Sequence, residues 1–459
     1  MTLPLTADPH GSRPIHLLPA RRFSEWLAEQ PAARASWLAG IGFEAKPGKT
    51  ALLPGPDGAP AAAVSIAGEP ASLWDVASAA CAVPAGTWRL DDPLGLVDPA
   101  EAAIGWSLAL YRFERYRKPA EAIPRLAVAD SGARRRAETI AGSVRFARDL
   151  VNTPANELGP AELEAAAAEL ALAIGASFSS IVGEALLEAG YPLIHVVGAA
   201  SPRPPRLIEL GWGEPDAPRV TLVGKGVCFD TGGLDLKPSS AMLLMKKDMG
   251  GAALMLGLTR AIAGLALPVR LRVLIPAVEN AVGGRAFRPG DVLRSRKGTT
   301  VEIGNTDAEG RLILADALAE ADRERPELLI DAATLTGAAR VALGPELPAL
   351  FTPEDPLAAE LLAAGARVAE PLWRLPLHAP YRKYLDSRVA EINNAGQKSF
   401  AGAITAALFL KEFVSETRAW AHLDVFAWND ESRPGRPKGG EATALRPLLE
   451  LLERRYRPG

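Results

Sequence analysis

From residue 190 onward, short runs of apolar and β-branched residues alternate with longer stretches that have the apolar spacing of helices. The predicted strands are residues 192–197, 206–210, 220–223, 269–275, 300–303, 328–332 and 421–425. The helices predicted between them include residues 248–263, 311–321 and 357–368. Continuous apolar strands separated by helices are typical of an α/β fold whose mostly parallel sheet is covered by helices on both faces. Functional residues in such folds lie beyond the carboxyl ends of the strands, so we expect the site at that edge.

The first 130 residues contain shorter elements and no cluster of residues that suggests chemistry. The apolar runs 50–53 and 62–67 flank a turn rich in Pro and Gly, which predicts a hairpin. Residues 106–116 have helical spacing, and residues 125–129 predict one more strand. We therefore predict a smaller N-terminal α/β domain, residues 1–132, with a structural or oligomerisation role.

The rest of the chain, residues 133–459, is predicted to form a large catalytic domain. A chain of 459 residues is long enough for roughly three domains, and one large domain with a smaller one fits as well. A helix is expected from about residue 133 to residue 150, and the sequence NTPAN at 152–156 then interrupts it. The next helix is predicted to begin at Pro160 and to end before Gly175, because Pro favours the first helical position and Gly follows the last.

Composition excludes several classes of protein. The chain has two cysteines, Cys81 and Cys228, which excludes a disulfide framework and a cysteine-based zinc site. The five histidines are too scattered to form a metal-binding pair. A net charge of −3 gives no reason to expect nucleic-acid binding. No apolar run approaches the roughly 18 residues of a membrane span, and the N-terminal segment lacks the apolar stretch of a signal peptide. We expect a soluble cytoplasmic protein with no membrane partner.

Two polar clusters follow predicted strands. The first, GKGVCFDTGG at 224–233, continues to Lys237 and to MKKDMGG at 245–251. Its glycines do not have the spacing of a phosphate-binding loop. The second cluster, GNTDAEGRL at 304–312, contains two carboxylates and an arginine. Together the clusters contain four carboxylates, which are Asp230, Asp248, Asp307 and Glu309.

Four carboxylates at the ends of adjacent strands allow two interpretations. If the backbone is extended there, Asp307, Glu309 and Arg311 project to one side, because side chains alternate along a strand. Charges grouped in this way are costly unless something compensates them. Two divalent cations about 3.5–4 Å apart would do so, and carboxylates suit Mg²⁺, Mn²⁺ and Zn²⁺. A network of salt bridges with Lys and Arg at the rim of a loop would also do so, and spacing alone does not distinguish the two.

The sequence NTDAEGRL at 305–312 resembles the signature of the leucyl aminopeptidase family, the dinuclear cytosol aminopeptidases. The resemblance covers roughly residues 140–430. It continues through GKGVCFDTGG, MKKDMGGAA (245–253), DAATLTGA (331–338), PLWRLPL (371–377) and AGAITAALFL (401–410). It implies a metal-dependent aminopeptidase that removes the N-terminal residue of a peptide, with a broad preference for Leu-like side chains. The nucleophile would be a water that bridges two divalent ions per subunit, Mn²⁺ or Zn²⁺, with Mg²⁺ as a further choice.

The same resemblance implies which residues hold the metal ions. The ligands would be Lys225, Asp230, Asp248, Asp307 and Glu309. Asp230 and Glu309 would bridge the two ions. Asp307 would complete the more exchangeable site, and Lys225 and Asp248 would complete the tighter one.

The resemblance also implies two catalytic residues and a substrate pocket. Lys237 would polarise the scissile carbonyl. Arg311 would hold a bicarbonate ion that acts as the general base. The pocket for the first side chain would be lined by Met245, Thr334 and Gly337.

Members of this family act on peptides with a free N-terminus and assemble as homohexamers, and the resemblance implies the same here. Two alternatives belong to other classes of protein: a dinuclear phosphoesterase that uses the same carboxylates, and a nucleic-acid-binding or scaffolding protein, since some relatives bind DNA. The net charge of −3 argues against the second alternative. Near the substrate pocket, KGGEATALR at 438–446 departs from the usual Gly-Ala-Thr-Gly run, so the preferred side chain stays open.

Overall fold

The computed structural model describes residues 3–118, 122–417 and 419–457. The chain divides into two compact units. The first contains the residues up to Arg145 together with Glu431–Lys438, and the second contains Phe146–Asp430 and Gly439–Gly459. The division falls within helix α5 (Ser131–Asn152). The first unit therefore includes a segment from late in the chain, which no local sequence pattern indicates.

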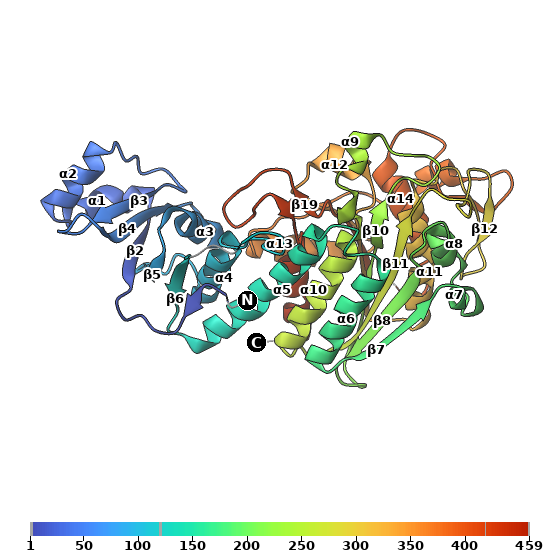
Figure 1. The fold of residues 1–459 in the computed structure, drawn as a ribbon, viewed down its shortest axis with the longest axis horizontal. Helices are drawn as coiled ribbons and strands as arrows, with labels where there is room; N and C mark the ends of the chain where they lie inside the picture. Colours follow the sequence, from blue (N-terminus) through green and yellow to red (C-terminus); the bar gives the residue numbers. More distant parts are fainter. Residues whose placement is uncertain (1–2, 119–121, 418, 458–459) are drawn as a thin grey trace. The chain divides into compact units, whose positions relative to one another are not determined.

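The first unit is built on a six-stranded sheet with the strand order β1-β6-β5-β2-β4-β3 (Figure 1). Its strands are β1 (Leu5–Thr6), β2 (Arg13–Pro19), β3 (Thr50–Pro54), β4 (Pro60–Ala67), β5 (Gly86–Asp91) and β6 (Pro124–Ala127). Its helices are α1 (Phe23–Ala28), α2 (Ala32–Gly40), α3 (Leu73–Ala82) and α4 (Pro99–Ala109). Neighbouring strands are parallel except β3 and β4, which form the predicted hairpin. The strand predicted near residue 125 is also confirmed, as β6.

The helix predicted at 106–116 is wrong in its bounds, because α4 begins at Pro99 and ends at Ala109. The Asp98 side chain fixes the start, since its Oδ1 accepts hydrogen bonds from the backbone N–H groups of Ala100 (2.9 Å) and Glu101 (3.2 Å). Apolar spacing continues past the end of the helix, so spacing alone did not locate either end.

The second unit contains a nine-stranded sheet with the order β16-β15-β18-β14-β9-β11-β8-β7, in which β10 pairs with β11. Its strands are β7 (Ser177–Val182), β8 (Arg206–Trp212), β9 (Arg219–Gly224), β10 (Gly226–Asp230), β11 (Arg270–Asn280), β14 (Leu328–Ala333), β15 (Ala349–Phe351), β16 (Trp373–Arg374) and β18 (Trp420–Asp424). The central strands β11, β9, β14 and β18 are parallel, as predicted. Antiparallel pairing occurs toward the edges, at β8 and β7 on one side and at β15 on the other.

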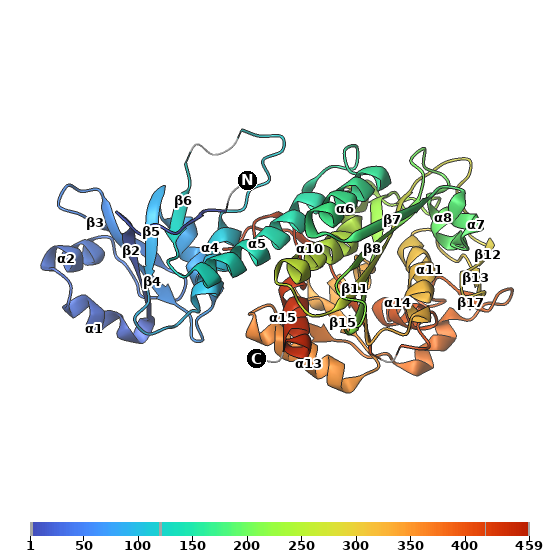
Figure 2. The same ribbon diagram turned by 90° about the horizontal axis from the view of Figure 1, so that it is seen from below.

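Helices cover both faces of this sheet, which confirms the predicted α/β fold. Figures 1 and 2 show one group of helices on one side of the sheet and a second group on the other. The first group is α6 (Pro160–Ile174), α10 (Gly250–Gly264) and α15 (Leu445–Tyr456), with α13 (Asp355–Arg367) packed against α15. The second group is α8 (Pro192–Gly198), α11 (Glu309–Arg323) and α14 (Gly402–Lys411). In the described part of the chain, no helix combines the length and the apolar character needed to cross a bilayer.

One strand prediction for this unit is wrong, and another is confirmed as a strand but lies in a separate sheet. Residues 192–197 form helix α8, whose first N–H groups, on Leu193 and Ile194, donate to the carboxylate of Asp316 at 2.7 and 3.3 Å. A short apolar run that is buried on all sides has no periodicity that separates strand from helix, and the carboxylate that caps it lies far along the chain. The predicted strand at 300–303 is β13 (Thr300–Glu302), which belongs to a small separate sheet with β12 (Val292–Arg294) and β17 (Ile392–Asn393).

A buried ion pair connects β14 and β18. His422 Nδ1 lies 2.5 Å from Asp331 Oδ1, and Trp420 Nε1 donates to Asp331 Oδ2 at 2.7 Å. Burial by itself lowers the pKa of His422, but the charge of Asp331 and the hydrogen bond to it outweigh burial and raise that pKa above its ordinary value. The imidazolium form therefore stabilises the fold.

The Asp331→Asn substitution is expected to destabilise the protein by on the order of 3 kcal/mol at pH 6 and by less at pH 9. Because the pKa of His422 is raised on folding, its contribution is fully present below about pH 6.5 and is lost as the pH rises through the raised value. Denaturant unfolding at the two pH values measures the difference. The control is Asp386→Asn, which removes an exposed ion pair with Arg382 and should cost less than about 1 kcal/mol. A loss that is the same at both pH values would contradict a charged His422.

Candidate active site

The first polar cluster lies at the carboxyl ends of the central strands. Lys225 is the single residue between β9 and β10, and Asp230 is the last residue of β10. Asp248 lies on a short 3₁₀ helix, η2 (Met245–Met249), that leads into α10. The sequence predicted that Asp248 begins the helix at 248–263. In the structure α10 begins two residues later, at Gly250, and Asp248 lies in the 3₁₀ helix before it.

The second cluster turns rather than continuing a strand. After β13 the chain bends at Thr306 and Asp307, and α11 begins at Glu309. The prediction that Asp307, Glu309 and Arg311 project to one side of an extended backbone is therefore wrong. Two residues advance a helix by about 200°, so Glu309 and Arg311 point in nearly opposite directions. Glu309 contacts Lys225, whereas Arg311 Nη1 donates to the backbone oxygen of Asn394 at 2.7 Å.

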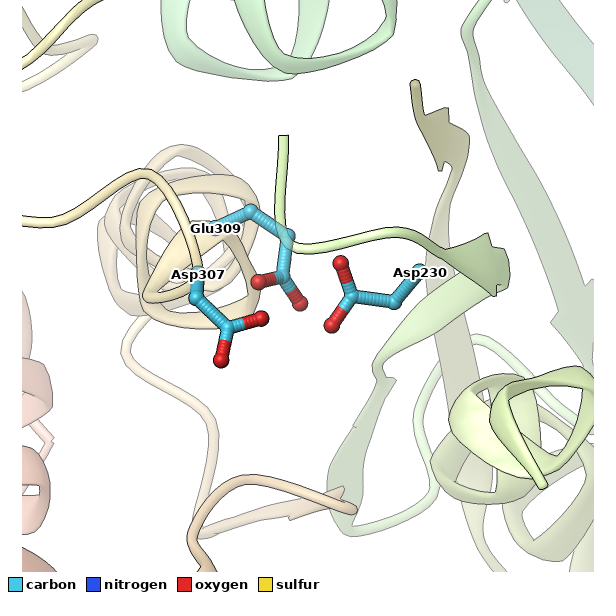
Figure 3. A group of neighbouring side chains, drawn as sticks. All are labelled: Asp230, Asp307 and Glu309. Carbon is cyan, nitrogen blue, oxygen red and sulfur yellow. The ribbon is translucent and has the colours of Figure 1, made fainter. Parts of the chain in front are cut away.

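Three carboxylates converge on one point (Figure 3). Asp230, Asp307 and Glu309 each offer an oxygen, and these oxygens all lie within 4.8 Å of one another. Asp230 and Glu309 are buried and Asp307 is half-buried. The carboxylates come from the end of β10, from a turn and from the first turn of α11, so the fold assembles them from segments that are distant along the chain.

Two lysines neutralise part of this charge. Lys225 Nζ lies 2.8 Å from Asp248 Oδ2 and 2.9 Å from Glu309 Oε1. Lys237 Nζ lies 2.8 Å from Asp230 Oδ2 and also contacts Asp307. A Cβ atom on Gly310 would lie 2.7 Å from Lys225 Nζ, so only glycine permits this close approach to α11.

Burial and mutual repulsion disfavour the charged carboxylates. Burial, followed by the charge of Asp230, raises the pKa of Glu309 to about 8 and that of Asp307 to about 6. Burial likewise raises the pKa of Asp248. For Lys225, burial lowers the pKa, but the charges of Asp248 and Glu309 outweigh it and raise the pKa above its ordinary value. The cluster thus has more negative charge than its own cations compensate.

This donor set fits divalent metal ions. Both oxygens of Glu309, Oδ1 of Asp307 and Oδ2 of Asp248 are buried, and a lysine ammonium is the only donor that reaches them among the described residues. The lysine ion pairs reach three of these four oxygens, and Glu309 Oε2 is the fourth. Buried carboxylate oxygens in excess of cationic partners are the donors that hard divalent cations prefer. Of the two interpretations, the structure favours metal binding over a closed salt-bridge network.

Some residues that position the cluster were not predicted. Asn280, the last residue of β11, donates from Nδ2 to Asp230 Oδ1 at 2.8 Å. Asn394 accepts at Oδ1 from the backbone N–H groups of Gly304 (2.8 Å) and Asn305 (3.2 Å). A polar residue at the end of a buried strand could have drawn attention to Asn280. However, the strand was predicted to end at residue 275.

The guanidinium of Arg311 is buried beside the cluster, with Nε unpartnered among the described residues. Burial lowers the pKa of Arg311 to about 10, and the charges of Glu309 and Asp424 act in the opposite direction. The side chain therefore remains a cation at neutral pH. A buried cation with an unused donor is suited to binding a small anion.

The cluster and the predicted substrate-pocket residues line one cavity of about 800 Å³. Met245, Thr334 and Gly337 are among its lining residues. Thr334 Oγ1 donates to Asp248 Oδ1 at 2.7 Å, which connects the pocket wall to the cluster. Every residue that was predicted for the site therefore lies at this cavity.

Phe426, Lys247 and Arg340 are among the residues of the cavity wall that were not predicted. Phe426 follows β18, and its ring centroid lies 4.4 Å from Lys247 Nζ and 4.8 Å from the Arg340 guanidinium carbon. Burial lowers the pKa of Lys247 to about 8, so the ammonium form predominates at neutral pH.

Fold and site together define a two-unit α/β protein with a buried carboxylate–lysine centre suited to divalent cations. Residues 145–449 match the model of the cytosol aminopeptidase family catalytic domain, and residues 13–129 match the M17 aminopeptidase N-terminal domain. The chain belongs to the cytosol aminopeptidase (M17) family.

Individual relatives agree with this assignment. The chain is 44% identical over 392 residues to a probable cytosol aminopeptidase of Syntrophotalea carbinolica, an alignment that covers 80% of this chain and 78% of the relative. It is 37% identical over 443 residues to a probable cytosol aminopeptidase of Rhodococcus opacus, covering 91% and 88%.

Solved structures show the same fold. A crystal structure of cytosol aminopeptidase from Coxiella burnetii matches with a TM-score of 0.94 and 47% identity, covering 99% of each chain. The bottromycin maturation enzyme BotP in complex with Mn matches with a TM-score of 0.87 and 39% identity, covering 97% of this chain and 100% of BotP. The protein is an aminopeptidase of a metal-dependent family, and the alternative activity of a phosphoesterase is not supported.

Proposed function

We propose that this aminopeptidase binds two divalent metal ions at the carboxylate–lysine cluster and cleaves the first peptide bond of its substrate beside them. The proposed ligands are Lys225, Asp230, Asp248, Asp307 and Glu309. The observation that carries the proposal is the convergence of three carboxylates within 4.8 Å, with buried oxygens on Asp307 and Glu309 that no donor other than a lysine reaches among the described residues. Mn²⁺ and Zn²⁺ are the proposed ions, with Mg²⁺ as a further choice, because all three accept carboxylate oxygens.

The ligands differ in accessibility, which supports a division of roles. The Asp307 side chain is 32% exposed, whereas those of Asp248 and Lys225 are 4% and 3% exposed. A ligand that water reaches exchanges its ion more readily, so Asp307 is assigned to the more exchangeable site, and Lys225 and Asp248 to the tighter one. The central carboxylates Asp230 and Glu309 are assigned as bridging ligands. Lys225 must lose its proton to become a ligand, so metal binding at this site displaces a proton.

Lys237 and Arg311 are proposed to act on the substrate side of the centre. Divalent ions bound there supply an activated water nucleophile and positive charge for the developing oxyanion. Lys237, once it is released from its pairing with Asp230 and Asp307, adds a cationic donor for the same oxygen. Arg311 offers its unpartnered Nε to a bicarbonate ion, which would accept the proton of the attacking water.

The Lys237→Ala and Arg311→Ala variants are expected to retain their metal ions and to lose activity. Removing one oxyanion donor at Lys237 should lower kcat for leucine anilide by about 10²–10³-fold. Arg311→Ala should in addition lose any stimulation by added bicarbonate. Metal content by elemental analysis accompanies the kinetics, and Lys246→Ala, which removes a neighbouring cation from outside the cavity, is the control. A variant that comes back without metal would move its residue into the ligand set.

The side chain of the first residue is proposed to enter the part of the cavity that Met245, Thr334 and Gly337 line. Met245 and the backbone at Gly337 present an apolar, uncrowded wall, which supports broad acceptance of Leu-like side chains. Assays of the purified protein after removal of metal and reconstitution with Mn²⁺, Zn²⁺ or Mg²⁺ test the proposal directly. Turnover of leucine anilide should require added ion and should follow occupancy of two ions per subunit.

We also propose a homohexamer in the cytoplasm, with the N-terminal unit in a structural or assembly role. Several large apolar side chains of the second unit are exposed, among them Leu243 (78%), Val341 (86%) and Phe400 (73%). Exposed apolar side chains of this size are typical of surfaces that assembly covers. Size-exclusion chromatography with light scattering measures the mass of the assembly. A monomer would contradict the proposal.

A further inference from the structure

Lys247 has a buried cation without an anionic partner. The residue is 5% exposed and lines the cavity, and among the described residues no carboxylate forms an ion pair or a hydrogen bond with its ammonium group. The ammonium group lies 4.4 Å from the centroid of the Phe426 ring. An aromatic ring compensates a buried ammonium only in part, so this cation is available to an anion that enters the cavity.

The two carboxylates closest to Lys247 are already engaged. Asp248 contacts Lys225 through Oδ2 and accepts from Thr334 Oγ1 through Oδ1. Asp424 accepts at Oδ1 from the backbone N–H groups of Leu335 and Thr336, and at Oδ2 from Thr336 Oγ1. Each oxygen of both carboxylates is therefore in contact with a group other than Lys247, although the charges of both act on it.

A second unpaired cation lies close by. The Arg340 guanidinium carbon is 4.8 Å from the centroid of the same Phe426 ring, and Arg340 also lines the cavity. Within the described parts of the chain, Arg340 forms no ion pair either. The ring of Phe426 thus has a buried ammonium and an exposed guanidinium close to it, and neither forms an ion pair among the described residues.

This positive region belongs to the wall that is proposed to receive the first side chain. Lys247 lies two residues after Met245 on the same 3₁₀ helix, and Arg340 lies one turn after Gly337 on α12 (Gly337–Leu343). Arg311, the cation of the second polar cluster, donates instead to the backbone oxygen of Asn394.

We propose that Lys247 and Arg340 make this aminopeptidase accept acidic first residues, with the side-chain carboxylate of glutamate or aspartate bound beside Phe426. The inference rests on the proposed function, because it assigns the wall near Met245 and Gly337 to the first residue. A carboxylate there would give Lys247 the charged partner that the protein lacks, and Arg340 would add a second donor. Leu-like side chains would contact Phe426 and Met245 in the same pocket, so the preference is for both classes rather than for acidic residues alone.

The test compares glutamic acid α-(4-nitroanilide) with leucine 4-nitroanilide on the metal-loaded enzyme. Wild type is expected to hydrolyse the glutamyl substrate with a kcat/KM within about tenfold of the leucyl value. Lys247→Met keeps the length of the side chain and removes its charge, and should lower the glutamyl-to-leucyl ratio of kcat/KM by about 10–100-fold. Arg340→Gln, at an exposed position, should lower the ratio by about threefold. Free glutamate should compete with leucine anilide in wild type and lose potency in Lys247→Met by the same factor.

The matched control is Lys246→Met, the same substitution one residue away. Lys246 donates to the backbone oxygen of Asn152 and does not line the cavity, so the ratio should stay at the wild-type value. If the substitution also weakened metal binding at the neighbouring Asp248, the rates for both substrates would fall equally. The glutamyl-to-leucyl ratio would then be unaffected by that loss.

Three results would overturn the inference. The first is a wild-type preference for the leucyl over the glutamyl substrate above about 10³-fold, and the second is an unchanged glutamyl-to-leucyl ratio in Lys247→Met. The third is a Lys247→Met substitution that lowers the hydrolysis of Leu-Gly but not that of Leu-Gly-amide. That result would mean that the cations bind the terminal carboxylate of the peptide. If metal-loaded wild type fails to hydrolyse leucine anilide at all, the proposed function itself fails, and the two failures are thereby distinguished.

Discussion

The Asp307→Asn variant is expected to lose activity on leucine anilide by at least about 10³-fold while it stays folded. The substitution keeps the shape of the side chain and removes one ligand charge, and affinity for hard cations depends on the number of carboxylates. Because Asp307 is the most exposed of the proposed ligands, the more exchangeable ion should be lost first. Elemental analysis is expected to find one ion per subunit in place of two.

Circular dichroism and hydrodynamic size accompany this measurement. Asp291→Asn removes a carboxylate of the same type, which pairs with Arg288 and does not line the cavity, and should retain both ions and full activity. Full activity of Asp307→Asn with one ion missing, or collapse of its fold, would count against Asp307 as a metal ligand.

Acetylation of the substrate's α-amine is expected to lower hydrolysis by on the order of 10⁴-fold. A free amine offers a lone pair to a divalent cation, and the acetylated nitrogen does not. The acetyl group also adds bulk in a cavity of about 800 Å³ whose walls include the buried side chains of Lys225, Asp248 and Arg311. A site built around a polar group rejects analogues that lack it, because its own polar groups are then left unpaired.

The measurement compares leucine anilide with its N-acetylated form at equal concentration and with metal restored. A blocked substrate that is hydrolysed by trace deacetylation would show a lag, so initial rates are required. Comparable initial rates would mean that the enzyme acts on internal amide bonds, and the restriction to N-terminal residues would be wrong.

Much of the fold could be predicted because the central strands are buried on both faces. The runs 220–223, 328–332 and 421–425 each match a strand, since β9, β14 and β18 consist almost entirely of buried residues, most of them apolar. The short strand β10 was missed because it follows β9 after one residue, so the two strands look like one strand and a loop. The apolar run at 192–197 was assigned to the wrong element for a different reason, since its helix depends on the distant cap Asp316.

The site could be predicted to the extent that its residues are grouped along the chain. The two polar clusters supplied every proposed ligand and both proposed catalytic residues, although the second cluster follows β13, which belongs to a separate sheet. The positioning residues Asn280 and Asn394 lie outside the clusters, and their roles depend on hydrogen bonds to segments 50 and about 90 residues away. No local pattern contains that information.

The sequence by itself determined the chemistry that this protein has available and the edge of the sheet where it lies, because residue type, order and strand burial are local properties. Only the tertiary structure decided which charges meet. Lys225 contacts Asp248 and Glu309 and donates to the backbone oxygen of Thr334, 109 residues away, whereas the nearby Lys247 contacts a ring and has no carboxylate partner among the described residues. The energy of a buried charge depends on its neighbours in space and on the water removed from it, and folding brings those neighbours together from segments that are distant in sequence.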